Sequence, residues 1–374
     1  MKAICDRAAL VDILTHVNGV ITTRTPKPIL ECIKLEAKNG MLTLSGTDLE
    51  TAVRVGTGRV DIQEDGEALV PADKMTQICR NTFDATLAIE VKDDITHIRG
   101  EGTKFKIFGH SPEEFPGIPE PGDLAADYHI DAEQLALLIE RTIFATAHEN
   151  SRYAINGVLM KRTGKTVEFV ATDGRRLALA RGKCTDCADG EGQCIVPTKA
   201  LNLLMKIVAS FDKDADVSVT IEDNRAVFII DSDGDEPAML STNLVEGTFP
   251  PYQDVIPKDL DKKAVFEADV LDTAVRQAAL LTNEDSKGIC LSFAESGLAI
   301  SSRAPELGEA DIKVPLEKYA GDDMEIGFNP TFITDALRHV EGNDVIIELK
   351  ASNKPGMIKS GNDFLYVLMP VSLS

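Results

Sequence analysis

The segment VPTKALNLLMKIV at residues 196–208 has a counterpart in each of the other two thirds of the chain. These counterparts are VPADKMTQICRN at 70–81 and NPTFITDALRHV at 329–340, so the three prolines lie 126 and 133 residues apart. Proline favours the first position of a helix because its missing N–H would have no intrahelical acceptor there. We therefore predict three repeats of one module, each with a helix that begins at this proline.

The signals around this helix recur in the same order. Helical periodicity precedes it at residues 6–20, from 131 and from about 267, and alternating strand patterns follow, two of them closing each repeat. The pattern predicts an α+β fold of three tandem copies of a two-helix, antiparallel multi-strand domain. We place the domains at 1–120, 127–252 and 260–374, with linkers near 117–127 and 250–263.

Composition excludes several classes of protein. The chain has 374 residues, 43% hydrophobic and 27% charged, which is typical of a globular protein and not of a disordered one. It contains no run of 18 apolar residues, and Asp6, Arg7 and Asp12 interrupt the place where a signal peptide would need an apolar run. We therefore expect a cytoplasmic protein with no membrane segment.

The sequence offers little to support catalysis. Cys184, Cys187 and Cys194 could supply three thiolates to zinc, but no fourth ligand follows nearby, and a flexible hairpin tip is the simpler interpretation. There is no phosphate-binding G-x-x-x-x-G-K-[ST] loop and no H-E-x-x-H motif. We predict no enzyme, no cofactor and no metal. A hydrolase assembled from distant residues and an acidic protein-binding scaffold remain the alternatives.

Charge is unevenly distributed along the chain. The formal net charge of −22 argues against an ordinary grip on DNA by summed phosphate contacts. The predicted helices nevertheless carry cations at similar offsets, whereas acidic runs fall in strands and loops. A solvated helix face is the alternative interpretation of each one. These helical cations are Lys74, Arg80, Arg141, Lys199, Lys206, Arg276 and Arg338.

Five segments, taken in order, resemble the bacterial DNA polymerase sliding clamps, the beta subunits of DNA polymerase III, over essentially the whole length. They are Arg24 with Pro28-Ile29-Leu30, SRYAINGVL at 151–159, ATDGRRLA at 171–178, Phe249-Pro250 with Tyr252, and YVLMPV at 366–371. The resemblance implies a head-to-tail homodimer that closes into a ring around double-stranded DNA without sequence readout, with helices lining the hole and sheets outside. It also implies a processivity factor whose partners are the polymerase III catalytic subunit, the clamp loader, and other polymerases and repair proteins with short clamp-binding peptides.

The same resemblance implies three sets of site residues. The walls of a pocket for partner peptides would be Ile155, Thr172, Gly174, Arg175, Arg176, Leu177, Pro250, Val255, Phe332, Val367, Leu368, Met369, Pro370 and Val371. Residues facing DNA would include Arg24, His148, Arg152 and Tyr153 beside the helical cations Arg80, Arg141, Lys199, Lys206, Arg276 and Arg338. The dimer interface would involve Lys74, Lys104, Phe105, Leu280, Leu281, Glu306 and Glu309, although a plain core role is the alternative for the two leucines.

Three positions depart from the family pattern. Glu149 places an acid in the loop expected to approach phosphate, which is unfavourable. Ala154 is small where relatives often carry a larger side chain. Ser372 stands where a basic residue is common, at the outer rim of the predicted pocket.

Overall fold

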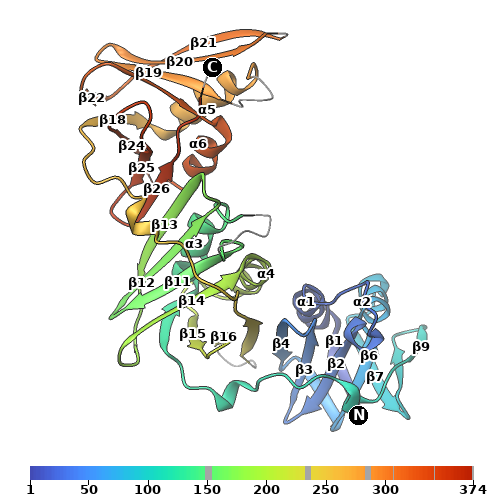
Figure 1. Cartoon of the computed structure of the whole chain (residues 1–374). Helices are drawn as coiled ribbons and strands as arrows, with labels where there is room; N and C mark the ends of the chain where they lie inside the picture. Colours follow the sequence, from blue (N-terminus) through green and yellow to red (C-terminus); the bar gives the residue numbers. More distant parts are fainter. Residues whose placement is uncertain (148–153, 232–236, 283–287, 306, 341, 373–374) are drawn as a thin grey trace. The chain divides into compact units, whose positions relative to one another are not determined.

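A computed structural model of the chain describes residues 1–147, 154–231, 237–282, 288–305, 307–340 and 342–372 (Figure 1). The chain forms two compact units. Unit 1 contains residues 1–136 and 183–244, and unit 2 contains residues 137–182 and 245–374. The middle third of the chain therefore contributes to both.

Unit 1 contains two antiparallel sheets. The first has the order β5-β1-β7-β8-β9, from Val60–Glu64, Lys2–Asp6, Thr86–Lys92, Ile95–Arg99 and Lys104–Phe108. The second has the order β10-β15-β16-β17-β4-β3-β2-β6, from Tyr128–Asp131, Asp216–Ile221, Arg225–Ile230, Ala238–Asn243, Thr51–Thr57, Met41–Thr47, Cys32–Lys38 and Gly66–Pro71. Strands β17 and β4 pair in the register Met239↔Arg54 to Thr242↔Thr51, so one sheet joins the first and second repeats.

Unit 2 is built in the same way. One sheet contains the run β11-β12-β13-β26-β25-β24-β18-β22, from Gly157–Thr163, Thr166–Thr172, Arg176–Lys183, Phe364–Leu368, Gly356–Ser360, Asp344–Leu349, Lys262–Glu267 and Lys318–Ala320. The other has the order β21-β20-β19-β23, from Gly308–Val314, Gly297–Ala304, Ile289–Ala294 and Met324–Phe328. Pairing of β13 with β26, from Arg176↔Leu368 to Ala180↔Phe364, joins the second and third repeats.

Each repeat has two α-helices among the described residues, as predicted. They are α1 (Arg7–Asn18) and α2 (Ala72–Asn81), α3 (Ala132–Ile143) and α4 (Thr198–Val208), and α5 (Ala268–Ala279) and α6 (Pro330–Leu337). Figure 1 shows α1 and α2 side by side over the strands of the first repeat. The buried side chains of α1 (Leu10, Leu14 and Val17) follow the helical period and face β3 and β4. The predicted α+β fold with two helices per repeat is confirmed.

The prediction that every second helix begins at its proline is right for one helix and one residue early for the other two. Pro330 is the first residue of α6, and the side chain of Asn329 caps it by accepting from the Thr331 N–H. Pro71 and Pro197 instead precede their helices with ψ of 117° and 140°, because each is also the last residue of a strand. An extended ψ lets one residue close the strand and precede the helix.

None of the helices among the described residues is both long enough and apolar enough to cross a membrane. The domain limits that we predicted are not the limits of the two compact units, which divide the middle third of the chain. Those limits stay a prediction.

Candidate functional site

A mainly apolar pocket of about 170 Å³ lies within unit 2, and we call it the apolar pocket. The β12–β13 hairpin forms one side, the segment around the short 3-10 helix η4 (Tyr252–Asp254) forms a second, and β26 with the residue after it forms the third. Its lining residues are Ile155, Thr172, Gly174, Arg175, Arg176, Leu177, Pro250, Tyr252, Val255, Val367 and Met369. Ten of the fourteen residues predicted for a peptide pocket are thus brought together.

The turn between β12 and β13 is fixed by its own polar side chains. Thr172 Oγ1 donates to the Arg176 carbonyl at 2.6 Å and accepts from the Gly174 N–H at 3.1 Å. Asp173 Oδ1 accepts from the N–H groups of Arg175 and Arg176. Gly174 has φ of +86°, a conformation that costs glycine little and other residues more. The turn therefore presents Thr172 and Gly174 to the pocket in one rigid arrangement.

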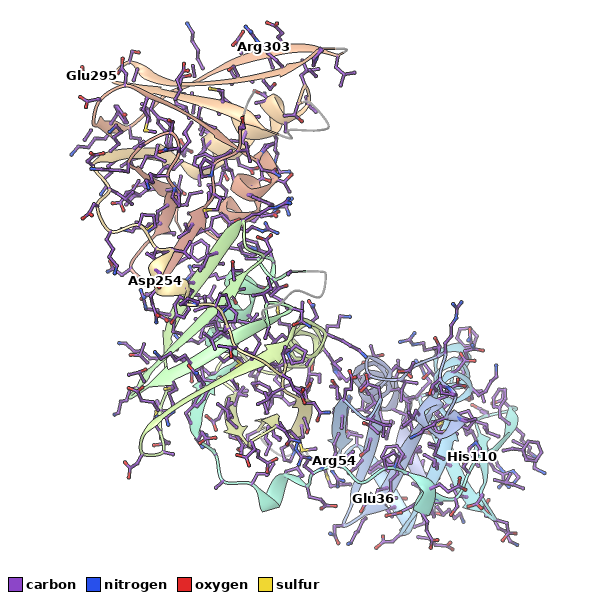
Figure 2. The ribbon with its side chains drawn as sticks, viewed as in Figure 1. Glu36, Arg54, His110, Asp254, Glu295 and Arg303 are labelled. Carbon is purple, nitrogen blue, oxygen red and sulfur yellow. The ribbon has the colours of Figure 1, made fainter. Side chains whose placement is uncertain are left out.

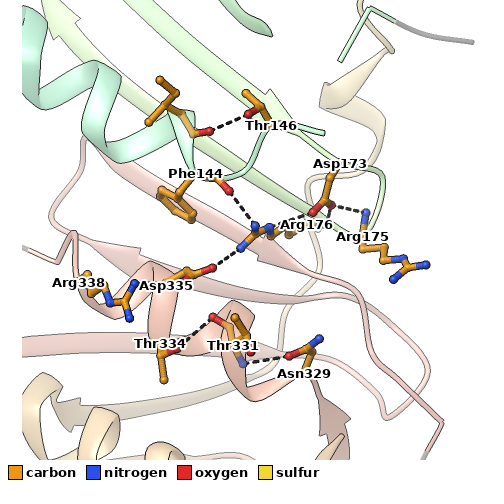
Figure 3. A network of polar contacts seen from close by, with 11 residues as sticks. Phe144, Thr146, Asp173, Arg175, Arg176, Asn329, Thr331, Thr334, Asp335 and Arg338 are labelled. Carbon is orange, nitrogen blue, oxygen red and sulfur yellow. Dashed lines mark hydrogen bonds and ion pairs between the residues drawn. The ribbon is translucent and has the colours of Figure 1, made fainter. Parts of the chain in front are cut away.

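Arg176 joins the pocket wall to elements far apart in sequence (Figure 3). Its guanidinium donates to Asp173 at 3.0 Å, to Asp335 at 2.7 Å and to the Phe144 carbonyl at 2.7 Å. It also lies 4.5 Å from the ring centre of Phe332. Burial lowers the pKa of the Arg176 guanidinium. The interactions with Tyr366, Asp335 and Asp173 raise it by more, so the pKa lies above its ordinary value. Arg176 is therefore a charged structural link beneath the pocket.

Four predicted wall residues do not line the pocket, for a geometric reason in each case. Phe332 lies against the Arg176 guanidinium. Leu368 alternates with Val367 and Met369, so it points to the opposite face and is 3% exposed. Pro370 and Val371 lie beyond β26, and the Val371 N–H donates to the Gly327 carbonyl at 2.9 Å.

One wall residue was missed at the sequence level. Tyr252 lines the apolar pocket, yet in the sequence it stands out only as one of the residues that carry the resemblance. Its place beside Pro250, two residues away in sequence, was the available signal. Only the structure shows that η4 turns the ring toward the β12–β13 hairpin.

The predicted DNA-facing cations are largely exposed, and several have acidic or hydroxyl neighbours. In unit 1, Arg80 donates to Thr15 Oγ1 at 3.1 Å and Lys199 pairs with Asp48. In unit 2, Arg276 pairs with Asp272 at 2.6 Å and Arg338 lies 3.4 Å from Asp335. The exposed members of the set are Arg24, Arg80, Lys199, Lys206, Arg276 and Arg338. His148, Arg152 and Tyr153, like Glu149, lie outside the described residues.

The expectation that Arg141 faces DNA is wrong. Its side chain is only 3% exposed, and its guanidinium lies 5.6 Å from the ring centre of Phe364. Arg141 is adjacent to the fully buried Thr142, three residues after Leu138, on the apolar side of α3. The charge of Arg141 predicts an exposed side chain. The helical period instead places Arg141 beside buried residues, in the interior.

Three of the residues predicted for a dimer interface lie on strands at two sheet edges. Strand β9, with Lys104 and Phe105, is the last strand of its sheet, and β21, with Glu309, is the last strand of another. Leu280 is 76% exposed, which excludes a plain core role for it, and Leu281 is half-buried. Lys74 is exposed on α2 and pairs with Asp73, whereas Glu306 lies outside the described residues.

Exposed apolar residues beside these edges were missed. Phe108 on β9 is 70% exposed and Leu307, next to β21, is 66% exposed. Arg303 on β20 extends outward near the same edge and lies 3.6 Å from Glu309 (Figure 2). The alternation in KFKIF at 104–108 already placed Phe108 on one side with Lys104 and Lys106, and could have indicated it.

The cysteines give no support to a zinc site. The Sγ atoms of Cys184 and Cys187 lie 3.2 Å apart, and Cys194 is buried in β14 (Glu191–Pro197). Within the described ranges, no three His, Cys, Asp or Glu side chains gather in a way that could hold a metal ion.

Comparisons with known proteins agree along the whole chain. Family models for the N-terminal, central and C-terminal domains of the DNA polymerase III beta subunit match residues 1–119, 129–251 and 253–372. The beta sliding clamp of Pseudomonas putida is 33% identical, with 98% of each chain covered, and that of Escherichia coli is 31% identical, with full coverage of both.

Solved structures give the same result for the fold. The Bacillus subtilis DNA polymerase sliding clamp superposes with a TM-score of 0.93 at 25% identity, and the DNA polymerase III subunit beta of Pseudomonas aeruginosa with 0.90 at 30%. Each comparison covers all of both chains. The chain therefore belongs to the DNA polymerase III beta subunit family, the beta sliding clamps, and is a non-catalytic processivity factor of DNA replication.

Proposed function

We propose that two copies of this chain close head to tail into a ring around duplex DNA and tether the replicative polymerase to it in the cytoplasm. The observation that carries the ring is the pair of open sheet edges, β9 and β21, each with a large apolar side chain exposed beside it. Open edges with apolar neighbours favour strand pairing with a second chain. One edge belongs to the first repeat and the other to the third, which suits a head-to-tail contact.

Within this ring, DNA would be threaded and only weakly held. Exposed cations occur on α2, α4 and α5 and at the end of α6, so every repeat supplies at least one. Contacts from such side chains to phosphates position a duplex without reading its sequence. Several already have acidic partners, which lowers their gain on binding phosphate and keeps the barrier to sliding low.

The apolar pocket would bind short apolar peptide segments of the polymerase, the clamp loader and repair proteins. Val255 and Met369 line it and remain 39% and 38% exposed, so apolar surface is available to a ligand. Aliphatic and methionine side chains adapt to differently shaped partners, which suits several proteins competing for one site.

Retention on DNA tests the ring. After loading by a clamp loader, the protein should stay on a nicked circular duplex through gel filtration and should be lost when a restriction enzyme linearises the circle. Equal retention on circular and linear DNA would contradict encirclement and would indicate an ordinary DNA-binding protein or scaffold.

A charged substitution tests the pocket separately. Met369→Glu should abolish stimulation of the polymerase while the protein is still retained on the circle, because the pocket loses its apolar floor. Full stimulation by Met369→Glu would contradict the assignment of the pocket. Met324→Glu, at a partly buried position on β23 outside the pocket, is the control.

A further inference from the structure

A second hollow, of about 300 Å³, lies beside the apolar pocket within unit 2, and we call it the polar pocket. Its lining is mostly polar or charged, unlike that of its neighbour. The lining residues are Lys161, Thr163, Thr166, Glu168, Leu179, Arg181, Tyr252, Gln253 and Ile256. Tyr252 belongs to both linings, so one side chain separates the two pockets.

The two pockets lie along one face of the β12–β13 pair. On β12, Thr172 lines the apolar pocket and Glu168 the polar pocket; on β13, Leu177 lines the first, and Leu179 with Arg181 the second. Within each strand these positions differ by even numbers, and alternate residues of a strand share a face. The strand rise puts neighbouring positions on that face about 6.6 Å apart. An extended peptide has the same spacing between its alternate side chains, so a single short peptide can reach both pockets.

Tyr252 is held in place by the polar pocket. Its hydroxyl donates to Glu168 Oε1 at 2.5 Å, and Glu168 Oε2 accepts from the Arg181 Nε at 2.8 Å. Burial first, and then the bond to Glu168, raises the pKa of Tyr252, so its hydroxyl remains a proton donor at neutral pH. The wall shared by the two pockets is therefore fixed from the polar side.

The charges of the polar pocket favour an anion. The lining contains two cations, Lys161 and Arg181, and one carboxylate, Glu168. Glu168 already accepts two hydrogen bonds. Lys161 lies opposite Glu168 in the β11–β12 ladder, on the same face of the sheet. The Arg181 side chain is 42% exposed, and it bonds Glu168 through its Nε. Donors thus remain for an incoming ligand.

We propose that the polar pocket binds an acidic side chain of the same partner peptide whose apolar side chain fills the apolar pocket. This inference rests on the proposed function and adds a specificity determinant to it. The acidic residue lies two to four positions from the apolar anchor, which matches the spacing along β12 and β13. Lys161 and Arg181 supply charge-assisted hydrogen bonds to its carboxylate.

Binding of synthetic peptides tests the proposal. The probe is a fluorescein-labelled ten-residue peptide of Ser and Gly with a central Leu-Leu pair, prepared with Asp or Asn at each position two to four residues before or after the pair. At one or more of these positions, the Asp peptide should bind the wild-type protein about five-fold more tightly than its Asn counterpart, as partly exposed ion pairs allow. Equal affinity of Asp and Asn peptides at all positions would overturn the proposal while leaving the proposed function intact.

Variants assign the preference to the polar pocket. Lys161→Gln should remove most of the preference for Asp with little change in the affinity for the Asn peptide, because the hydroxyl of Tyr252 is held by Glu168. Lys161→Glu should reverse the preference toward a Lys-containing peptide. Lys165→Gln is the matched control, since Lys165 is exposed in the turn of the same hairpin and lines neither pocket. A preference that survives in Lys161→Glu and Arg181→Gln would place the acid elsewhere and refute the inference.

The same measurements separate failure of the inference from failure of the proposed function. Binding of neither peptide to the wild-type protein, even at high concentration, would contradict the apolar pocket as a peptide site. Binding of both peptides that is lost in Met369→Glu but indifferent to Asp would support the proposed function and refute only the acidic specificity.

Discussion

Asp335 is the residue through which the apolar pocket meets the surface that we propose for DNA. One carboxylate oxygen accepts a hydrogen bond from Arg176 at 2.7 Å, and the other lies 3.4 Å from Arg338. The Arg176 side chain is 9% exposed, and that of Arg338 is 57% exposed. The buried bond to Arg176 therefore accounts for most of the contribution of Asp335 to stability, and the exposed contact with Arg338 contributes little.

Replacing Asp335 should destabilise unit 2. Asp335→Asn leaves the buried guanidinium with one fewer charged acceptor, and we expect a loss of about 2 kcal/mol in the free energy of unfolding. Asp272→Asn, which removes the charge of the half-buried partner of the exposed Arg276, should cost about 0.5 kcal/mol or less. Urea unfolding followed by circular dichroism measures both, and equal losses would contradict the structural role of Arg176.

The buried cysteines of unit 1 should resist alkylation. Burial raises the pKa of Cys5, Cys79 and Cys194 to about 12, so at pH 8 only about one thiol in ten thousand is the reactive thiolate. Cys187, which is partly exposed, is the internal control. Iodoacetamide labelling with mass spectrometry should modify Cys187 first. Labelling of Cys5 as fast as Cys187 in the native protein would contradict the burial.

The same pKa values give a pH dependence of stability. A thiol whose pKa is 9.0 in the unfolded chain and about 12 in the folded one binds its proton more tightly when folded. Its contribution to stability is complete below pH 9 and is lost as the pH rises from 9 to 12. The urea midpoint of the transition reporting unit 1 should therefore fall between pH 8 and pH 10.5, and Cys79→Ala should reduce that fall. An unchanged midpoint would contradict the raised values.

The sequence predicted the positions of some site residues correctly and of others incorrectly. Most pocket residues were found because motif positions transfer from a family one by one. Arg141 and Leu368 were misplaced because a charge or a motif does not say which side of a helix or strand faces solvent. Burial depends on the partner element, which lies far away in sequence.

At the scale of single elements, the end of β9 is fixed by a close approach. The Gly109 N–H donates to the Asp94 carbonyl at 2.9 Å, and the next N–H, of His110, donates to the Leu69 carbonyl at 3.0 Å. A Cβ atom on Gly109 would lie 2.4 Å from the Leu69 oxygen. Because that oxygen is backbone, an added methyl group would have to displace the strand.

Gly109→Ala should therefore lower stability and loosen the edge strand. We expect a loss of about 2 kcal/mol, in the range of overpacking in a filled site. Gly117→Ala, whose added Cβ would meet nothing within 4 Å, should be nearly neutral. Thermal unfolding compares the two, and hydrogen exchange of β9 amides should increase only in Gly109→Ala. Identical behaviour of the two variants would show that the contact with Leu69 does not constrain the strand.

Helices were predicted better than the pairing of strands. Apolar periodicity and a recurring proline are local, so the first residues of α2, α4 and α6 could be placed within one residue. The pairing of β17 with β4 joins positions such as Thr242 and Thr51, and the local sequence of neither strand predicts which strand pairs with it. Two sheets that cross from one repeat to the next were therefore absent from the sequence-based description.

At the scale of the whole molecule, the assembly should depend on apolar contacts more than on charge. Phe108 and Leu280 are exposed large apolar side chains near the predicted contact, and burying apolar surface is insensitive to salt screening. Light scattering should give a mass near twice 40.5 kDa, unchanged in 0.5 M sodium chloride.

A single charged substitution should break the dimer. Phe108→Lys should give a folded monomer, since an unpaired lysine would be buried in the contact. Leu49→Lys, at a residue 48% exposed between β3 and β4, is the matched control and should remain dimeric. A wild-type protein that is monomeric at all concentrations would contradict the head-to-tail ring.

The ladders β17–β4 and β13–β26 also explain how a chain of this family tolerates extensive evolutionary drift. Their hydrogen bonds join main-chain atoms. The pairing between repeats is therefore kept when side chains change, as long as the alternation and size of the side chains are preserved. The TM-score of 0.93 with the Bacillus subtilis clamp, at only 25% identity, is consistent with this tolerance. Surface side chains can therefore differ between two such chains while the ladders keep the fold the same.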